Sequence, residues 1–179
     1  MVQISTSVLE ILSLYRHDYL AEFHLRGIAR NLGKNHATVS RHIAGLEGIL
    51  QSRIEGKNRL FSLNLDNNLL VKYMSIAEDY QAMSLMEKRP ILRKLEFDAD
   101  GVVILFGSYV EGRETEGSDV DILHIGNQRL ESGRMYGRPV NIKNSTKAEF
   151  IEALRKNEAL PTEDVKKHAI LMNPEPFVR

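Results

Sequence analysis

The sequence of 179 residues has no cysteine and no apolar run near the length of a membrane-spanning helix. Without cysteine the chain forms no disulfide bond and no thiolate metal site, which is typical of proteins in reducing compartments. A helix needs roughly 20 apolar residues to cross a bilayer, so no membrane partner is expected. The first residues also lack the basic and apolar regions of a signal peptide. These absences predict a cytoplasmic protein.

The chain also lacks a net charge, because 24 Lys and Arg residues balance 24 Asp and Glu residues. Residues 1–65 nevertheless contain eight basic and five acidic residues, a net charge of +3, and the rest of the chain carries −3. A basic part followed by an acidic part indicates different partners for the two. The length suits two small domains.

The first part of the chain has the spacing of three helices followed by a β-hairpin. Apolar side chains recur at helical spacing over residues 7–17, 24–32 and 36–49. Gly33 ends the second helix, since glycine readily adopts a positive φ. Residues 52–65 then alternate between apolar and polar positions around a Gly-Lys-Asn turn, which predicts a hairpin.

This pattern resembles the helix-turn-helix of winged-helix transcription regulators, with the hairpin as the wing. The resemblance implies that residues 1–65 bind DNA, with the third helix at the major groove and the hairpin at backbone phosphates. The residues predicted to contact DNA are Asn35, His36, Arg41, Arg53, Lys57 and Arg59. A protein-docking or dimerisation domain would show the same charged outer face, so this alternative stays open.

The rest of the chain is predicted to form a helical connector over residues 66–89 and a second domain over residues 90–179. Strands are expected at residues 102–106, 120–123, 139–142 and 169–172, and helices at 91–97, 147–157 and 162–167. The first of these strands is continuously apolar, as strands buried on both faces are. The predicted fold class is therefore α+β: an N-terminal winged helix, a helical connector, and a C-terminal domain with a small mixed sheet.

Two short motifs in the second domain indicate its chemistry. Gly107 and Ser108 directly follow the apolar strand, where glycine permits close approach of a ligand and serine offers a donor to a phosphate oxygen. Asp119 and Asp121 are two residues apart on the next strand, so both carboxylates lie on one face. Adjacent carboxylates repel each other unless a cation lies between them, and hard oxygen ligands favour Mg²⁺ with a triphosphate. The motifs predict a site for Mg²⁺ and ATP or another NTP.

The same motifs, Leu-Phe-Gly-Ser-Tyr at 105–109 and Gly-Ser-Asp-Val-Asp-Ile-Leu at 117–123, resemble the minimal nucleotidyltransferases of the DNA polymerase beta superfamily. The resemblance implies that Gly107 and Ser108 hold the triphosphate, and that Asp119 and Asp121 are the metal ligands and catalytic residues. Catalytic members carry a third carboxylate on the following strand, where this sequence has Asn141. An amide cannot act as a general base.

Three functions stay open at this point. The first is a DNA-binding protein whose second domain binds Mg-NTP and slowly transfers a nucleotidyl group to a protein or nucleic-acid acceptor, with Glu149 and Arg113 as assisting residues. The second is a transcription regulator whose inactive transferase domain senses nucleotides or forms a homodimer. Resemblance to nucleotidyltransferase antitoxins implies a HEPN-type toxin as one acceptor. A protein-interaction scaffold is the third alternative, and it predicts neither nucleotide nor DNA affinity.

Overall fold

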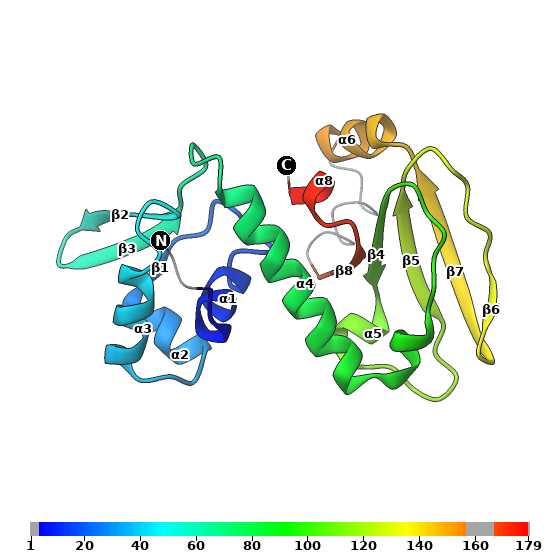
Figure 1. The fold of residues 1–179 in the computed structure, drawn as a ribbon, viewed down its shortest axis with the longest axis horizontal. Coiled ribbons are helices and arrows are strands. Elements are labelled where there is room, and N and C mark those ends of the chain that lie inside the picture. The colour runs from blue at the N-terminus through cyan, green and yellow to red at the C-terminus, as the bar shows by residue number, and fades with distance from the viewer. Residues whose placement is uncertain (1–3, 157–166, 179) are drawn as a thin grey trace. The chain divides into compact units, whose positions relative to one another are not determined.

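The computed structural model describes residues 4–156 and 167–178, and the chain divides into two compact units. The N-terminal unit comprises Met1–Ala77 and the C-terminal unit comprises Glu78–Arg179. Helix α4 (Leu70–Lys88) crosses this division, so its first turns belong to one unit and its last turns to the other (Figure 1). In the described residues no helix combines the length and the apolar character needed to span a membrane.

Besides the first turns of α4, the described residues of the N-terminal unit form three helices and a three-stranded antiparallel sheet of order β1-β3-β2. Its elements are α1 (Thr6–Ser13), β1 (Phe23–His24), α2 (Leu25–Asn31), α3 (His36–Ala44), β2 (Leu50–Glu55) and β3 (Asn58–Leu63). Leu12, Ile28 and Val39 of the three helices are fully buried and form its core. The phenol hydroxyl of Tyr15 donates to the backbone oxygen of Phe61 at 3.0 Å, and burial raises the pKa of Tyr15 above its usual range.

The structure differs from the sequence prediction at three places in this unit. The first helix ends at Ser13 instead of residue 17, and residues 14–17 form turns. The third helix ends at Ala44 instead of residue 49, because Gly45 caps it and Gly48 then adopts a φ of +87°. A two-residue strand, β1, also pairs with β3 and adds a third strand to the predicted hairpin. Such a short strand has no periodicity that a sequence could reveal.

The C-terminal unit is built on a five-stranded mixed sheet of order β6-β7-β5-β4-β8. Strands β5 and β7 are parallel, and the other neighbouring pairs are antiparallel. The strands are β4 (Val102–Phe106), β5 (Val120–Ile125), β6 (Gly133–Met135), β7 (Arg138–Ser145) and β8 (Ala169–Met172). The predicted α+β class with a mixed sheet is thereby confirmed.

Apolar clusters cover both faces of this sheet. Val103, Leu105 and Ile122 face a cluster that includes Leu92 of the 3₁₀ helix η1 (Pro90–Lys94) and side chains at the end of α4. Ile104 and Leu123 face the opposite way, toward α6 (Lys147–Arg155) and α8 (Glu175–Val178). Strand β4, which lies between β5 and β8, is buried along its whole length, as its apolar sequence predicts.

Three further predictions need comment. The helix expected over residues 91–97 is a single 3₁₀ turn at Pro90–Lys94, so that prediction was wrong in type and length. The hairpin of β6 and β7 was missed, although Tyr136 and Gly137 both adopt the positive φ of a type I′ turn. The helix expected from residue 162 falls on residues outside those that the structure describes.

Candidate functional site

A tight turn at Gly107 joins β4 to the short helix α5 (Ser108–Glu111). Gly107 has φ 72° and ψ −150°, a conformation that essentially only glycine adopts. A Cβ atom at this position would lie 2.7 Å from Oδ2 of Asp121. Glycine is therefore required here both by the backbone conformation and by the nearby carboxylate.

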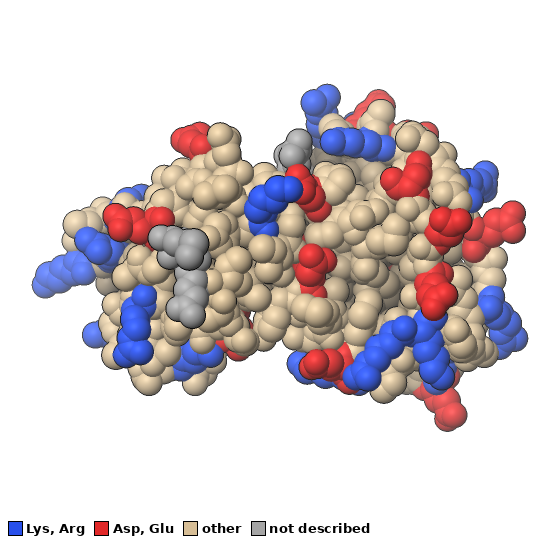
Figure 2. Space-filling view, viewed as in Figure 1, with Lys and Arg blue, Asp and Glu red and all other residues tan. Residues whose placement is uncertain are grey.

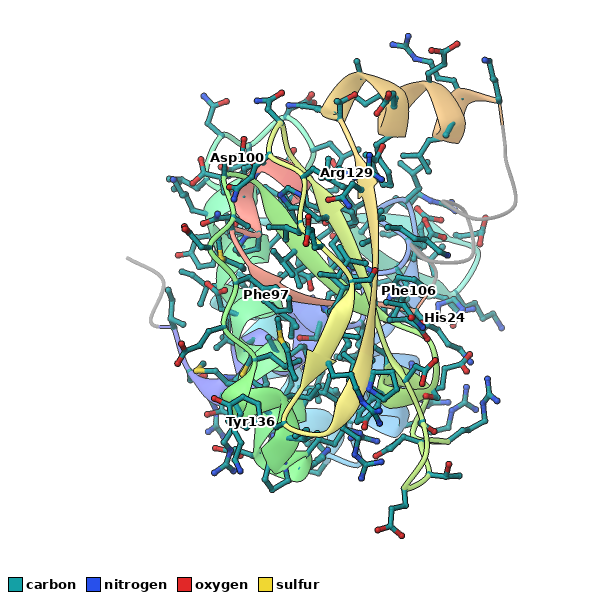
Figure 3. All side chains as sticks on the ribbon, turned by 90° about the vertical axis from the view of Figure 1, so that its right-hand side faces the viewer. His24, Phe97, Asp100, Phe106, Arg129 and Tyr136 are labelled. Atoms are coloured by element: carbon teal, nitrogen blue, oxygen red, sulfur yellow. The ribbon has the colours of Figure 1, made fainter. Side chains whose placement is uncertain are left out.

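Asp119 and Asp121 lie beside this turn, at the start of β5. Asp121 pairs with Phe106 of β4 on one side and with Asn141 of β7 on the other. Because paired residues on neighbouring strands point to the same face of a sheet, Phe106, Asp121 and Asn141 form one row. Figure 3 labels Phe106 in this row.

The side-chain amide of Asn141 joins the two carboxylates. Its Nδ2 donates to Asp119 Oδ2 at 3.1 Å and to Asp121 Oδ1 at 3.2 Å. The two carboxylates therefore converge on one nitrogen atom, close to the Gly107 turn. We call Gly107, Ser108, Asp119, Asp121 and Asn141 the carboxylate site.

The carboxylate oxygen atoms of the carboxylate site are suitable ligands for one divalent cation. Two carboxylates are hard oxygen ligands, and Mg²⁺ is commonly bound by one or two carboxylates together with water and phosphate oxygens. Within residues 4–156 and 167–178, no group of three or more His, Cys, Asp or Glu side chains could hold a metal. Asn141, the third member of the row, has no basic atom that could accept a proton from an attacking hydroxyl.

Two residues expected to assist the site are occupied elsewhere. Thr146 donates its backbone N–H to Glu149 Oε2 at 2.7 Å, and Glu149 donates its own N–H to the Thr146 hydroxyl at 3.2 Å. These bonds to Thr146 lower the pKa of Glu149 and close a capping box on α6, beyond the far end of β7 from Asn141. Arg113 contacts the carboxylate of Glu111. The signal for Glu149 was local, because Thr146 and Glu149 have the Thr-x-x-Glu spacing of a capping box at the start of a helix, and the sequence analysis missed it.

An ion pair supports the loop between α5 and β5. Arg89 Nε lies 2.7 Å from Glu114 Oε1, and Arg89 Nη2 donates to Glu114 Oε2 at 3.2 Å. Desolvation alone would raise the pKa of Glu114, but the bonds from Arg89 outweigh it and hold that pKa below its usual range. In the same loop, Thr115 donates its N–H to the Ser118 hydroxyl at 2.8 Å. These contacts hold the chain that leads into Asp119.

Lys143 is a basic residue near the site that the sequence analysis missed. It lies two residues after Asn141 on β7, so its side chain is on the same face of the sheet. Its Nζ lies 4.5 Å from the centroid of the Phe106 ring, in the row that contains Asp121. The signal that could have identified it was the period of two, counted onward from Asn141.

In the N-terminal unit, a groove of about 690 Å³ lies between α2, α3 and the β2–β3 hairpin. Among the residues that line it in the described part of the chain, none is acidic, and four are Lys or Arg. We call this feature the basic groove, and its charged or ionisable residues are His24, Arg26, Arg30, His36, Lys57 and Arg59. Figure 2 shows basic side chains at the hairpin end of this unit.

The predicted DNA-contacting residues divide into two sets in the structure. His36, Lys57 and Arg59 line the basic groove, whereas Asn35, Arg41 and Arg53 do not. Asn35 accepts the N–H of Thr38 at 2.8 Å and caps α3.

Arg53 makes a two-bond pair with Glu22, with Nε donating to Oε1 at 2.7 Å and Nη2 to Oε2 at 2.5 Å. The hydrogen bonds from Arg53 lower the pKa of Glu22. Arg53 also donates to Glu55 at 3.1 Å, so its charge is balanced within the unit. Conversely, Arg26 and Arg30 of α2 line the basic groove and were not assigned from the sequence.

The sheet, the glycine turn and the paired carboxylates together define the C-terminal unit as an α+β domain with a candidate site at the end of β4 and the start of β5. Residues 85–177 match the family described as nucleotidyltransferase domain. The match covers more than half of the chain, and the protein belongs to this family. No curated protein and no solved structure matches the chain.

Proposed function

We propose that the C-terminal unit binds a nucleoside triphosphate together with Mg²⁺ at the carboxylate site. The observation that carries this proposal is the convergence of Asp119 and Asp121 beside the Gly107 turn, within a domain of the nucleotidyltransferase family. The same arrangement supplies carboxylates for the metal and a glycine turn whose backbone a phosphate can approach. The proposed ligand is thus the Mg-NTP complex.

In this proposal each residue has a distinct role. Asp119 and Asp121 ligate the cation, which when bound polarises the phosphoryl oxygens and orients the leaving pyrophosphate. Gly107 lets phosphate approach the backbone, and the Ser108 hydroxyl donates to a phosphate oxygen. Lys143 adds positive charge on the same face of the sheet, which favours the polyanionic triphosphate.

Transfer would form a bond between an acceptor hydroxyl oxygen and the α-phosphorus while the bond to pyrophosphate breaks. The hydroxyl proton must then leave, and Asn141 cannot accept it. Loss of a general base typically slows a reaction about 10²–10⁴-fold. We therefore propose nucleotide binding with slow nucleotidyl transfer to a protein or nucleic-acid acceptor, and the presence of Asn141 favours nucleotide sensing without turnover as the second candidate.

Calorimetry with each NTP and Mg²⁺ tests the binding proposal. Asp119→Ala/Asp121→Ala should weaken binding at least about 100-fold, equal to about 2.7 kcal/mol. A matched control, Asp98→Ala/Glu131→Ala, removes the same charge from two exposed carboxylates of the same unit and should leave the affinity unchanged. Equal affinity of the wild type and the Asp119/Asp121 variant would contradict the proposal.

We propose further that residues 1–65 form a winged-helix domain that binds DNA, with phosphates in the basic groove. The absence of acidic residues from the described lining of this groove supports the proposal, because phosphate contacts depend on Lys and Arg. Arg41, outside the groove near the end of α3, is assigned to base contacts. Phosphate binding in the groove and base reading on α3 predict different effects of mutation.

Binding to mixed DNA sequences at several salt concentrations separates these roles. Arg26→Gln/Arg30→Gln should reduce the salt slope by about 0.9 for each lost phosphate contact. Arg53→Gln is the matched control. Because Arg53 is already paired with Glu22 and Glu55, this substitution should leave the salt slope almost unchanged. Arg41→Ala should weaken only specific sites, by about 1–3 kcal/mol. A slope that Arg26→Gln/Arg30→Gln does not change would contradict groove binding.

A further inference from the structure

We infer that Asn141 restricts the carboxylate site to a single divalent cation, because its amide occupies the side on which a second cation would bind. This inference rests on the proposed nucleotide binding and specifies its metal content. It goes beyond the missing general base, since it concerns how many metal ions the site holds.

The two oxygens of Asp121 face different neighbours. Oδ1 accepts a hydrogen bond from Asn141 Nδ2 at 3.2 Å. Oδ2 faces the Gly107 turn, where a Cβ atom would lie 2.7 Å away from it. Oδ2 takes no part in the bond from Asn141, so a cation bound through Oδ2 would leave the bond from Asn141 to Oδ1 in place.

The side of the site toward β7 is arranged differently. The amide nitrogen of Asn141 has two protons, and it donates to two carboxylate oxygens, Asp119 Oδ2 at 3.1 Å and Asp121 Oδ1. The parallel pairing of Asp121 with Asn141 fixes this position through the backbone. A cation on this side would have to displace both hydrogen bonds, and it would then meet a neutral amide in place of a third carboxylate.

Charge leads to the same result. Two divalent ions in a shared site lie about 3.5–4 Å apart and repel each other strongly. Here two carboxylates offset that repulsion, and no third acidic or histidine ligand joins them among the residues that the structure describes. An aspartate at position 141 would add the missing charge and remove the two hydrogen-bond donors.

One cation has a direct consequence for the acceptor. With a single cation bound through Asp121 Oδ2, the acceptor hydroxyl would meet neither a metal ion nor a base on the Asn141 side. The site is then suited to holding a nucleotide for longer than an active transferase would.

Counting Mn²⁺ ions tests the inference without measuring activity. The full chain is kept at a higher molar concentration than the non-hydrolysable nucleotide α,β-methylene ATP, so that little nucleotide is free. Mn²⁺ is then added in steps, and the free Mn²⁺ is followed by its electron paramagnetic resonance signal. We expect one Mn²⁺ for each bound nucleotide in the wild type and two in Asn141→Asp. The control Asn68→Asp adds the same charge at an exposed position of the N-terminal unit and should bind one.

Two tightly bound ions in the wild type, or one in Asn141→Asp, would overturn the inference. The wild-type count alone decides the matter if Asn141→Asp does not fold, which circular dichroism would reveal. Equilibrium dialysis of the nucleotide in the same samples separates failure of this inference from failure of the proposed function. If the proposed function is wrong, neither the wild type nor Asn141→Asp retains the nucleotide.

Discussion

The carboxylate site and the basic groove differ in how closely their charged groups are held. In the carboxylate site, neighbouring strands bring one carboxylate oxygen of Asp119 and one of Asp121 within 3.2 Å of the amide nitrogen of Asn141. In the basic groove, cationic side chains come from α2 and from the hairpin and line a space of about 690 Å³. Metal coordination demands ligand positions fixed to a few tenths of an ångström, whereas attraction to phosphate acts over longer distances. The rigid sheet suits the first task, and long, exposed side chains are sufficient for the second.

The largest effect should come from weakening the core of one unit only. Leu12→Ala removes a fully buried side chain of α1 and should destabilise the N-terminal unit by about 2–5 kcal/mol. DNA affinity should fall steeply near the new unfolding midpoint while nucleotide affinity stays unchanged. Thermal unfolding measures the loss of stability. Titration calorimetry of the wild type and the variant at the same temperatures measures the affinities for DNA and for nucleotide. An equal loss of DNA affinity and nucleotide affinity would contradict the independence of the two sites, because both would then depend on one core.

Gly107→Ala tests how strictly the carboxylate site depends on its backbone. The new Cβ atom would collide with Asp121 Oδ2 in a conformation suited to glycine, at a cost of about 1–3 kcal/mol in backbone strain. Nucleotide binding should be lost together with stability in urea denaturation. Gly117→Ala is the matched control, since no atom lies within 4 Å of its added Cβ. Unchanged nucleotide affinity in Gly107→Ala would show that the Gly107 turn takes no part in nucleotide binding.

Lys143→Gln should have a smaller effect, on nucleotide affinity alone. Removing one cation near a triphosphate should weaken Mg-NTP binding about tenfold, equal to about 1.4 kcal/mol. The loss should be greater for a triphosphate than for a monophosphate, which titration calorimetry with ATP and AMP would reveal. Lys147→Gln, which removes an exposed lysine of α6, serves as the control. Identical losses for ATP and AMP would exclude a phosphate contact by Lys143.

The smallest effect concerns acid stability at the other end of the sheet. Figure 3 places Asp100 at the opposite end from Tyr136. Desolvation alone would raise the pKa of Asp100, but the backbone N–H groups of Asn127 and Gln128, with the His124 ring, hold it below its usual range.

A lowered pKa means that ionised Asp100 stabilises the fold above about pH 4, the value of an unfolded aspartate, and that this contribution is lost as the pH falls through the lower folded value. Asp100→Asn should therefore be less stable than the wild type at pH 7 and should approach it at pH 3 in urea denaturation. Asp98→Asn is the control for general loss of charge. A stability difference for Asp100→Asn that does not shrink at low pH would contradict this assignment.

Much of the C-terminal unit could be predicted because its signals are local. The apolar run at 102–106 and the alternation around Asp121 specify strands that the structure contains. The same period of two places Asp119 and Asp121 on one face. Membership of the nucleotidyltransferase family, first indicated by the glycine and aspartate motifs, is shown by the match over residues 85–177.

Other features depend on partners distant in the sequence. The sequence places Arg53 on a hairpin but says nothing of Glu22, which neutralises it from 31 residues away. Glu149 is a different case, because its partner Thr146 is only three residues away and the Thr-x-x-Glu spacing of the capping box was missed in the sequence. The hairpin of β6 and β7 was missed because its first strand is only three residues long.

Composition and periodicity alone determined that this chain has a basic part and an acidic part, and which residues of each strand share a face. Only the tertiary structure decided that one amide donates to both carboxylates, and that Arg26 and Arg30 join Lys57 and Arg59 around one groove. The physical reason is that side-chain periodicity is a property of a single element. Contacts across elements depend on strand register and packing, which are settled only when the whole chain folds.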